Sequence, residues 1–283
     1  MSFAPLLELT KEAAAKGYAV PSFCAWNAET MKTILDEAQK MKAPVILMNG
    51  PGEFPLLSPG EMAAVAYSLI DRYTVPAALH LDHGDSLDMV RDCIGARYTS
   101  VMLDYSARPF EENVAALKKV VGMDHPANVT VEGELGMIGR DEATTTEGSK
   151  KSTFTDPEQA REYVERTGVD LLAVAIGNVH GFYRGEPHLE FDLLERIRSK
   201  VPAPLVLHGG TGLSEGDIRR GVSLGIVKVN VASELIYGIR SSLLSQWQAG
   251  RNPWVPQAFA EAVNAVRASI EKWIRITGAA GKA

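Results

Sequence analysis

The sequence is poor in cysteine, has no excess of positive charge and contains no long apolar run, and each absence excludes a class of protein. Cys24 and Cys93 are the only cysteines and form no CxxC pair, so neither a disulfide framework nor a thiolate metal cluster is expected. The formal net charge is −6, whereas a nucleic-acid-binding protein normally carries a basic face. No stretch reaches the roughly 18 apolar residues that cross a bilayer, so we expect neither a nucleic-acid nor a membrane partner.

Export signals are also missing. The first 20 residues contain no basic segment followed by an apolar stretch of signal-peptide length, which predicts a cytoplasmic protein. What is present is ordinary for a globular enzyme: 46% of the 283 residues are apolar and 23% are charged, enough for a sizeable core. No linker divides the chain, so we expect residues 1–283 to form a single domain.

Eight short runs rich in Val, Ile, Leu and Ala predict parallel strands. Parallel strands are covered on both faces, so they are apolar throughout rather than alternating. Helical patterns lie between the runs; one begins with Asp156 and Pro157 and ends at Gly168, as capped helices do. The predicted strands cover residues 19–24, 44–49, 77–83, 100–106, 128–136, 171–177, 204–210 and 226–232.

The positions of the polar residues distinguish a closed barrel from an open sheet. In nearly every predicted strand they lie at the carboxyl end, and barrel enzymes assemble their sites from the ends of many strands. No GxGxxG motif follows the first strand, which disfavours an open dinucleotide-binding sheet. We therefore predict an α/β (β/α)8 TIM barrel with a mobile active-site loop at about 139–156, or alternatively an exposed linker there, and one additional C-terminal helix at about 254–278.

Three histidines end predicted strands or begin the loops that follow. His83, His180 and His208 would converge at the mouth of one barrel, and three imidazoles with an open fourth position are typical of a catalytic Zn²⁺ site. Hydrogen-bonded structural histidines are the alternative, and a Ser-His-Asp hydrolase is a rival use. Strand alternation places His80 on the side opposite His83, or in the core.

Acidic residues accompany these histidines. Asp82 precedes His83 and would lie beside the metal as a hydrogen-bonding partner or a general acid or base. Glu132 and Glu134 share one face of a strand, where carboxylates need a cation or hydrogen bonds. Glu134 is thus a candidate site residue, with a structural salt bridge as the alternative, and Asp104 is a weaker candidate.

Glycine-rich segments follow the last two strands. HGGTGL at 208–213 precedes a helix, and NVAS at 230–233 follows the final strand. Loops after the seventh and eighth strands of a barrel often bind phosphate through backbone N–H groups and a helix N-terminus. The pattern predicts a small phosphorylated substrate.

Several stretches together resemble one family. HLDHGDSL, PFEENV, VEGELG, FTDPEQA, VDLLAVAIGNVHGFY, LVLHGGTGL and KVNVASEL occur in family order between about residues 5 and 278. The chain resembles the class II, metal-dependent ketose-bisphosphate aldolases, nearest to the tagatose-bisphosphate and fructose-bisphosphate group. The resemblance implies a lyase that uses one Zn²⁺ per subunit, in a homodimer or homotetramer.

By this resemblance, His83, His180 and His208 would be the metal ligands and Glu134 a secondary ligand. Asp82 would carry the proton of the C4 hydroxyl, and Glu142 would be the acid or base at the enediolate carbon. Substrate would be held by Gly181, Arg184, Gly209, Gly210, Thr211, Asn230, Ala232 and Ser233. Carbonyls of Val179, Gly181 and Gly209 would bind Na⁺ or K⁺.

Departures from the family pattern gather on the side of the second phosphate. Cys24 stands where Asn is usual, Tyr105 where Gly is usual, and Glu271 where an Arg often binds the distal phosphate. Arg108, Arg267 or Arg275 could replace that Arg.

The default prediction is reversible cleavage of a tagatose- or fructose-type ketose 1,6-bisphosphate to dihydroxyacetone phosphate and glyceraldehyde 3-phosphate. The alternatives are a ketose 1-phosphate that lacks the distal phosphate, a non-catalytic companion subunit, a metal-dependent hydrolase or isomerase, and a Schiff-base aldolase using Lys228.

Overall fold

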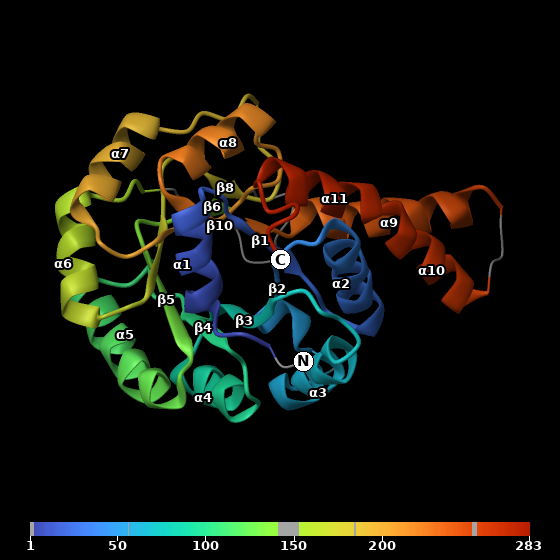
Figure 1. Ribbon diagram of the computed structural model, residues 1–283, viewed down its shortest axis with the longest axis horizontal. Helices are drawn as coiled ribbons and strands as arrows, with labels where there is room; N and C mark the ends of the chain where they lie inside the picture. Colours follow the sequence, from blue (N-terminus) through green and yellow to red (C-terminus); the bar gives the residue numbers. More distant parts are fainter. Residues whose placement is uncertain (1–2, 56, 141–152, 184, 251–253) are drawn as a thin grey trace.

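Eight parallel strands close into a barrel in the order β1-β10-β9-β7-β5-β4-β3-β2 (Figure 1). The computed structural model describes residues 3–55, 57–140, 153–183, 185–250 and 254–283. The barrel strands are β1 (Val20–Cys24), β2 (Val45–Asn49), β3 (Ala77–Gly84), β4 (Ser100–Leu103), β5 (Thr130–Leu135), β7 (Leu171–Val174), β9 (Leu205–Leu207) and β10 (Ile226–Val231). The predicted (β/α)8 barrel is confirmed.

Some predicted strands were too long at their carboxyl ends. β4 stops at Leu103 and β9 at Leu207, so Asp104 and His208 lie just beyond the hydrogen-bonded ladder. Their side chains bond to neighbours across the barrel mouth, and the backbone turns there to present them.

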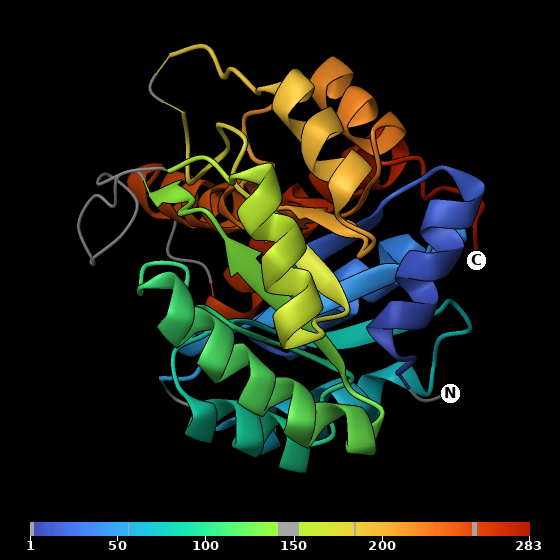
Figure 2. The ribbon, with the colours of Figure 1, turned by 90° about the vertical axis from the view of Figure 1, so that its left-hand side faces the viewer.

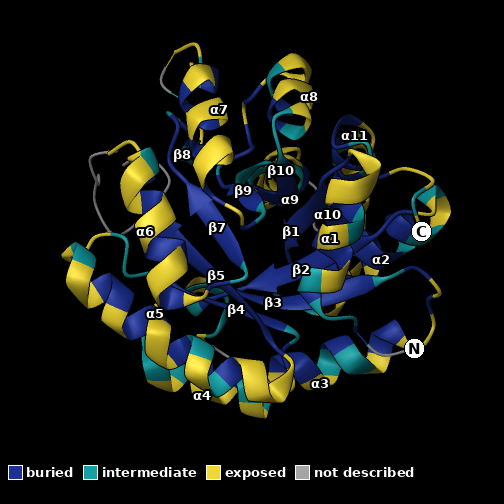
Figure 3. Cartoon of the chain, turned by 60° about the vertical axis from the view of Figure 1, so that its left-hand side comes forward, coloured by how far each residue is buried: buried dark blue, intermediate teal, exposed yellow. Residues whose placement is uncertain are grey.

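Helices surround the barrel and expose only their outer faces (Figure 3). The predicted cap of α6 is confirmed, since the Asp156 carboxylate accepts from the backbone N–H groups of Glu158 and Gln159 and Gly168 ends the helix at φ 75°. The helices are α1 (Leu6–Lys16), α2 (Ala28–Met41), α3 (Pro59–Ile70), α4 (Leu87–Gly95), α5 (Phe110–Asp124), α6 (Pro157–Thr167), α7 (Phe191–Lys200), α8 (Glu215–Ser223), α9 (Ser233–Gln248), α10 (Val255–Ala265) and α11 (Arg267–Ile276), with short 3-10 turns η1 (Pro51–Glu53) and η2 (His125–Ala127).

The C-terminal region contains two helices beyond α9 where one was predicted. The chain bends at Val266, so α10 packs on α9 and α11 packs on α2. Each helix buries its own apolar stripe: Ala262 and Val263 on α10, and Ile270 and Trp273 on α11. A single straight helix would bury only one of these surfaces.

An N-terminal helix that was not predicted closes the other end of the barrel. Figure 2 shows α1 across the amino ends of the strands, where the Leu7 N–H donates to Thr130 Oγ1 and the Ala4 N–H donates to the Ala77 carbonyl. The carboxyl ends of the strands are therefore the end open to a substrate. In the parts of the chain that the structure describes, no helix has the length and apolar character needed to cross a membrane.

A small two-stranded parallel sheet lies at the open end. β6 (Gly139–Arg140) pairs with β8 (Val179–His180). β6 begins the predicted active-site loop, whose residues 141–152 lie outside the described residues. The far end of the loop is held by Thr155, whose hydroxyl donates to the Leu135 carbonyl and accepts from the Ala175 N–H.

Candidate metal and substrate site

Three imidazole rings meet at the carboxyl end of the barrel. His83 is the last residue but one of β3, His180 lies on β8, and His208 follows β9. His83 Nε2 lies 3.2 Å from His180 Nε2 and 3.0 Å from His208 Nδ1. One nitrogen from each ring lies within 4.8 Å of the others, so the three rings could hold a single ion.

Two carboxylates orient two of these rings. Asp104 Oδ2 lies 2.9 Å from His83 Nδ1, and Glu132 Oε1 lies 2.8 Å from His208 Nε2. Burial raises the pKa of Asp104, but the hydrogen bond from His83 outweighs it and holds the pKa well below its ordinary value. Burial likewise raises the pKa of Glu132, but Lys228 and the hydrogen bond from His208 lower it to about 2. Both carboxylates are ionised and only accept hydrogen bonds, so the ring nitrogens that face them carry the protons.

The remaining nitrogens of these rings fit a cation. With Nδ1 of His83 and Nε2 of His208 protonated, the other two nitrogens present lone pairs to each other across 3.0 Å in the neutral rings. A positive ion between them relieves this repulsion. Burial lowers the pKa of His83, but Asp82 and Asp104 outweigh it and raise the pKa to about 9, so without a metal a proton on His83 takes this place, and a divalent ion would displace that proton. The donor set therefore fits a divalent metal with imidazole ligands.

Glu134 could supply a further ligand. It is buried, and its Oε2 lies 3.7 Å from His208 Nδ1 without a hydrogen-bond partner among the described residues. Burial and the Asp104 carboxylate raise the pKa of Glu134 to about 8. His83, Asp104 and Glu134 form a second potential ligand group, but Asp104 already accepts from His83 and from Ser106.

Asp82 lies beside the three rings. Its Oδ1 accepts from Asn230 Nδ2 at 2.8 Å, and its Oδ2 lies 3.9 Å from His83 Nε2. Strand alternation predicts opposite directions for Asp82 and His83, but the left-handed backbone of His83, with φ 48°, turns its ring toward the carboxylate. Burial raises the pKa of Asp82, but His83 and His80 hold it well below the ordinary value, so Asp82 is a charged carboxylate at the site.

The glycine-rich segments lie against β8. Gly209 has φ 66°, and a Cβ there would lie 2.1 Å from the Val179 carbonyl oxygen, so only glycine fits. The Gly210 N–H donates to the Asn230 carbonyl, and Thr211 Oγ1 accepts from the N–H of Glu234 in the first turn of α9. The two predicted phosphate-binding segments are thus bonded to each other beside the histidines.

Tyr183 was missed by sequence reasoning. Its hydroxyl accepts from the Val179 N–H at 3.3 Å and donates to the Gly209 carbonyl at 3.2 Å, which links β8 to the glycine-rich turn. Its position three residues after His180 carried no signal, because the contact depends on the turn at Gly181. Glu142 and Arg184, predicted as catalytic and substrate-binding residues, lie outside the described residues.

The fold and these segments match a known family along nearly the whole chain. The family model for fructose-bisphosphate aldolase class-II matches residues 4–282. The chain belongs to this family. It is therefore an enzyme, a carbon–carbon lyase of the class II, metal-dependent type.

Individual relatives agree with this assignment. The chain is 40% identical over 267 residues to the D-tagatose-1,6-bisphosphate aldolase subunit GatY of Klebsiella oxytoca, covering 94% of each protein. It is similar to the solved YdjI aldolase of Escherichia coli K12, with 36% identity, a TM-score of 0.88 and full coverage of both chains. A fructose-bisphosphate aldolase from Campylobacter jejuni, 22% identical, has the same fold with a TM-score of 0.82 over 98% of this chain and 95% of that chain.

On one side of this aldolase's barrel mouth, a thiol and a carboxyl group face each other instead of imidazole rings and carboxylates. At the ends of β1 and β2, the Cys24 thiol lies 3.5 Å from Glu53 Oε1, and the Gly50 N–H donates to Glu53 Oε2. A Cβ on Gly50 would lie 2.2 Å from the Asp82 carbonyl oxygen, so this segment passes directly against the end of β3. Burial raises the pKa of Glu53, and Asp82 adds to this effect. Sequence reasoning named Cys24 but missed Glu53.

The residues considered for the distal phosphate have other partners. Glu271 pairs with Lys40 and Arg275, and Arg267 pairs with Glu37 and Asp36. The pairs of Glu271 with Lys40 and of Arg267 with Glu37 and Asp36 join α11 to α2 on the outside of the aldolase barrel. Arg108 lies over the ring of Tyr105, with 5.7 Å between its guanidinium carbon and the ring centroid.

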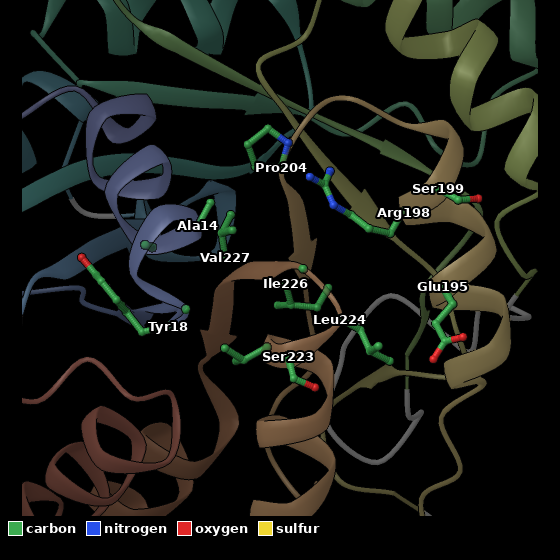
Figure 4. A pocket seen from close by; sticks show the side chains of 14 residues that line it. Ala14, Tyr18, Glu195, Arg198, Ser199, Pro204, Ser223, Leu224, Ile226 and Val227 are labelled. Atoms are coloured by element: carbon green, nitrogen blue, oxygen red, sulfur yellow. The ribbon is translucent and has the colours of Figure 1, made fainter.

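Two other features of the aldolase are structural. A GxSxG pattern occurs at Gly212–Gly216, but Ser214 is the N-cap of α8 and its hydroxyl bonds only to Asp217 among the described residues. An open pocket of about 540 Å³ lies at the amino end of the barrel, between α1, α7 and α8 (Figure 4). Its Arg198 already donates to the Val201 and Ala203 carbonyls, and the pocket is at the opposite end from the histidines.

Proposed function

We propose that this aldolase reversibly cleaves a ketose 1,6-bisphosphate of the tagatose or fructose type. The products would be dihydroxyacetone phosphate and an aldehyde, glyceraldehyde 3-phosphate by default. The observation that carries the proposal is the cluster of three imidazole nitrogens beside the charged Asp82 carboxylate. The name of the GatY relative, a tagatose-1,6-bisphosphate aldolase subunit, supports the substrate class.

We propose that His83, His180 and His208 hold one Zn²⁺ per subunit, with Glu134 as a secondary ligand. Cleavage of the C3–C4 bond leaves negative charge on the triose half, and bound Zn²⁺ supplies the Lewis acid that stabilises it. Asp104 has a positioning role through His83 rather than the role of a ligand, because its Oδ2 accepts from the ring.

Asp82 would act as the base that removes the proton from the C4 hydroxyl. Asn230 holds one of its oxygens at 2.8 Å, which leaves the other oxygen to meet the substrate. Asn230 would also contact the triose enediolate. Glu142 would transfer the proton at the enediolate carbon, as its place in the family pattern suggests.

The phosphate on C1 would lie on the glycine-rich segments. Backbone N–H groups near the N-terminus of α9 and the Thr211 hydroxyl supply donors of the kind that bind phosphate. This part of the site would comprise Gly181, Arg184, Gly209, Gly210, Thr211, Asn230, Ala232 and Ser233. A Na⁺ or K⁺ ion on the carbonyls of Val179, Gly181 and Gly209 would balance the phosphate charge.

Retro-aldol assays with a panel of ketose phosphates test the proposal directly. We expect cleavage of a 1,6-bisphosphate that a chelator abolishes and Zn²⁺ restores. Activity that survives the chelator and disappears with borohydride would overturn the zinc mechanism. Purified protein with less than about a tenth of an equivalent of divalent metal, and without activity after Zn²⁺ addition, would instead indicate a companion subunit.

We also propose that the aldolase is a cytoplasmic homodimer or homotetramer. α9 and α10 extend beyond the barrel as an arm (Figure 1) that exposes Trp247, Trp254 and Val255, with 73% of Trp254 accessible. Apolar side chains concentrated on a projecting element are typical of an interface. Light scattering coupled to size-exclusion chromatography would measure the assembly, and a monomer at micromolar concentration would contradict it.

A further inference from the structure

A charged cluster fills the barrel interior directly below the three histidines. Lys228 on β10, Glu132 on β5, His80 on β3 and Ser100 on β4 are all 0% exposed. Lys228 Nζ lies 2.9 Å from Glu132 Oε2, 3.1 Å from Glu132 Oε1 and 3.3 Å from His80 Nε2. His80 Nδ1 lies 2.8 Å from Ser100 Oγ. Lys228 Nζ is therefore hydrogen-bonded to Glu132 Oε1 and His80 Nε2, and it forms an ion pair with Glu132 Oε2.

Such a cluster is unusual in this location. The interior of an eight-stranded barrel is normally filled by branched apolar side chains in layers. A buried ion pair loses the hydration of both charges, and apolar residues of similar volume are often as stable or more stable. Stability alone therefore does not explain why Lys228 and Glu132 occupy this position.

The cluster contacts the site above it at two points. Glu132 Oε1 accepts from His208 Nε2 at 2.8 Å, and His80 Nε2 lies 3.8 Å from Asp82 Oδ1. Glu132 pairs with an ammonium, so it accepts the His208 proton rather than donating one. This contact fixes the plane of the His208 ring and leaves Nδ1 as the nitrogen that faces His83, 3.0 Å away.

We propose that Lys228 and Glu132 are positioning residues that orient His208 and thereby set the affinity of the three-histidine site for its divalent ion. This inference rests on the proposed metal site. Lys228 does not act as a Schiff-base nucleophile, because its side chain is fully buried below the rings and its nitrogen is held by Glu132 and His80. Carboxylates that accept from the second nitrogen of a ligand histidine commonly control metal affinity in this way.

Metal affinity, measured apart from activity, tests the inference. We expect Glu132→Gln and Lys228→Met to weaken Zn²⁺ binding about 10- to 100-fold in a chelator-competition titration. In Glu132→Gln the amide oxygen can take the place of Oε1 and accept from both His208 and Lys228, but it is neutral, and the NH₂ group then faces Lys228 Nζ in place of Oε2. The visible spectrum of Co²⁺-loaded protein should change in both variants, because the His208 ring is no longer held in one orientation.

A matched control separates positioning from folding. Glu37 is also buried, 3% exposed, and accepts from Arg267 at 2.6 Å on the far side of α2. Glu37→Gln should lower the melting temperature and leave Zn²⁺ affinity within twofold of the original protein. If either cluster variant fails to fold, the double variant Glu132→Met with Lys228→Met removes both charges together; it should fold and still bind Zn²⁺ weakly.

The outcomes are distinguishable. Unchanged Zn²⁺ affinity and an unchanged Co²⁺ spectrum in variants that fold would overturn the positioning role while the proposed function stands. A double variant with the original affinity would overturn it in the same way. Failure of the unmodified protein to bind Zn²⁺ at all would overturn the proposed function and this inference together.

Discussion

Two sectors of the barrel mouth hold their polar side chains in different ways. In the sector formed by the ends of β3, β4, β5, β8, β9 and β10, charged groups are held by directed partners at 2.8–2.9 Å in the contacts of Asp104 with His83, Glu132 with His208 and Asn230 with Asp82. In the sector formed by β1 and β2, a thiol and a carboxyl group, Cys24 and Glu53, lie 3.5 Å apart. A thiol is a weak donor, so this second contact constrains its partners less.

The first sector would govern the reaction, and the second sector would govern which substrate is accepted. The first sector carries every described residue proposed to bind the metal, the triose phosphate or the C4 proton, and its partners leave little freedom for change. The second sector departs from the family pattern at Cys24 and borders Asp82, where the aldehyde half of the substrate would lie. Substitutions in the two sectors should therefore have different consequences.

The largest effect is expected from removing a ligand in the first sector. His208→Ala should abolish metal binding and reduce kcat/KM by at least about a thousandfold, because two imidazoles bind Zn²⁺ far more weakly than three. Metal content by atomic emission and retro-aldol rate should fall together. His188→Ala is the control, since 83% of that side chain is exposed outside the site; full metal content in His208→Ala would contradict the assignment.

Asp82→Asn should have the next largest effect. The amide keeps the size of the side chain but cannot take the C4 proton, so kcat should drop about 10²- to 10⁴-fold. The metal content should stay near one equivalent, since Asp82 is proposed as a base and not as a ligand. Equal losses of metal and of rate would instead make Asp82 part of the metal site.

The second sector should show a change of preference rather than a loss of rate. Glu53→Gln removes an ionisable group beside Asp82, so a negatively charged tail should be accepted more readily. We expect kcat/KM for a ketose 1,6-bisphosphate to rise roughly tenfold relative to the matching 1-phosphate. Parallel changes for both substrates would show that the β1–β2 sector does not contact the aldehyde half.

The smallest effect is expected at a carboxyl group outside both sectors. No function is proposed for this group, so replacing it should change stability and leave activity unchanged. Asp124 is buried at the end of α5, and neither of its oxygens has a hydrogen-bond partner among the described residues. Burial and Asp170 raise its pKa to about 7. Between pH 4 and 7 the folded protein binds more protons here than the unfolded chain, so this group lowers stability as pH rises through that window.

Asp124→Asn removes the titration. The variant should be more stable than the original protein by about 1–2 kcal/mol at pH 8, with a melting temperature a few degrees higher, and should show little difference near pH 4. Calorimetry of both proteins across this range measures the difference, and activity serves as the control. A difference that is constant with pH would mean that Asp124 is already ionised at pH 4.

The eight strands could be predicted because each is a continuous apolar run, and their order followed from the alternation with helices. The bend at Val266 and the closure by α1 could not, because an amphipathic pattern shows which face is apolar but not which surface it will cover. Glu53 and Tyr183 were missed for a similar reason. Each acts through a partner distant along the chain or through a turn; Glu53 stands in none of the family stretches, and Tyr183 ends one of them without showing which groups its hydroxyl contacts.

The sequence by itself determined the barrel, the three histidines at its strand ends and the resemblance that predicted a class II aldolase. These features depend on residue type and spacing, which the chain carries locally. Only the tertiary structure decided which nitrogen of each ring faces its neighbour, that Asp82 and His83 approach across a left-handed turn, and that Lys228 and Glu132 pair beneath them. Lys228 and Glu132 lie 96 residues apart, and only closure of the barrel brings their charges together in a buried interior.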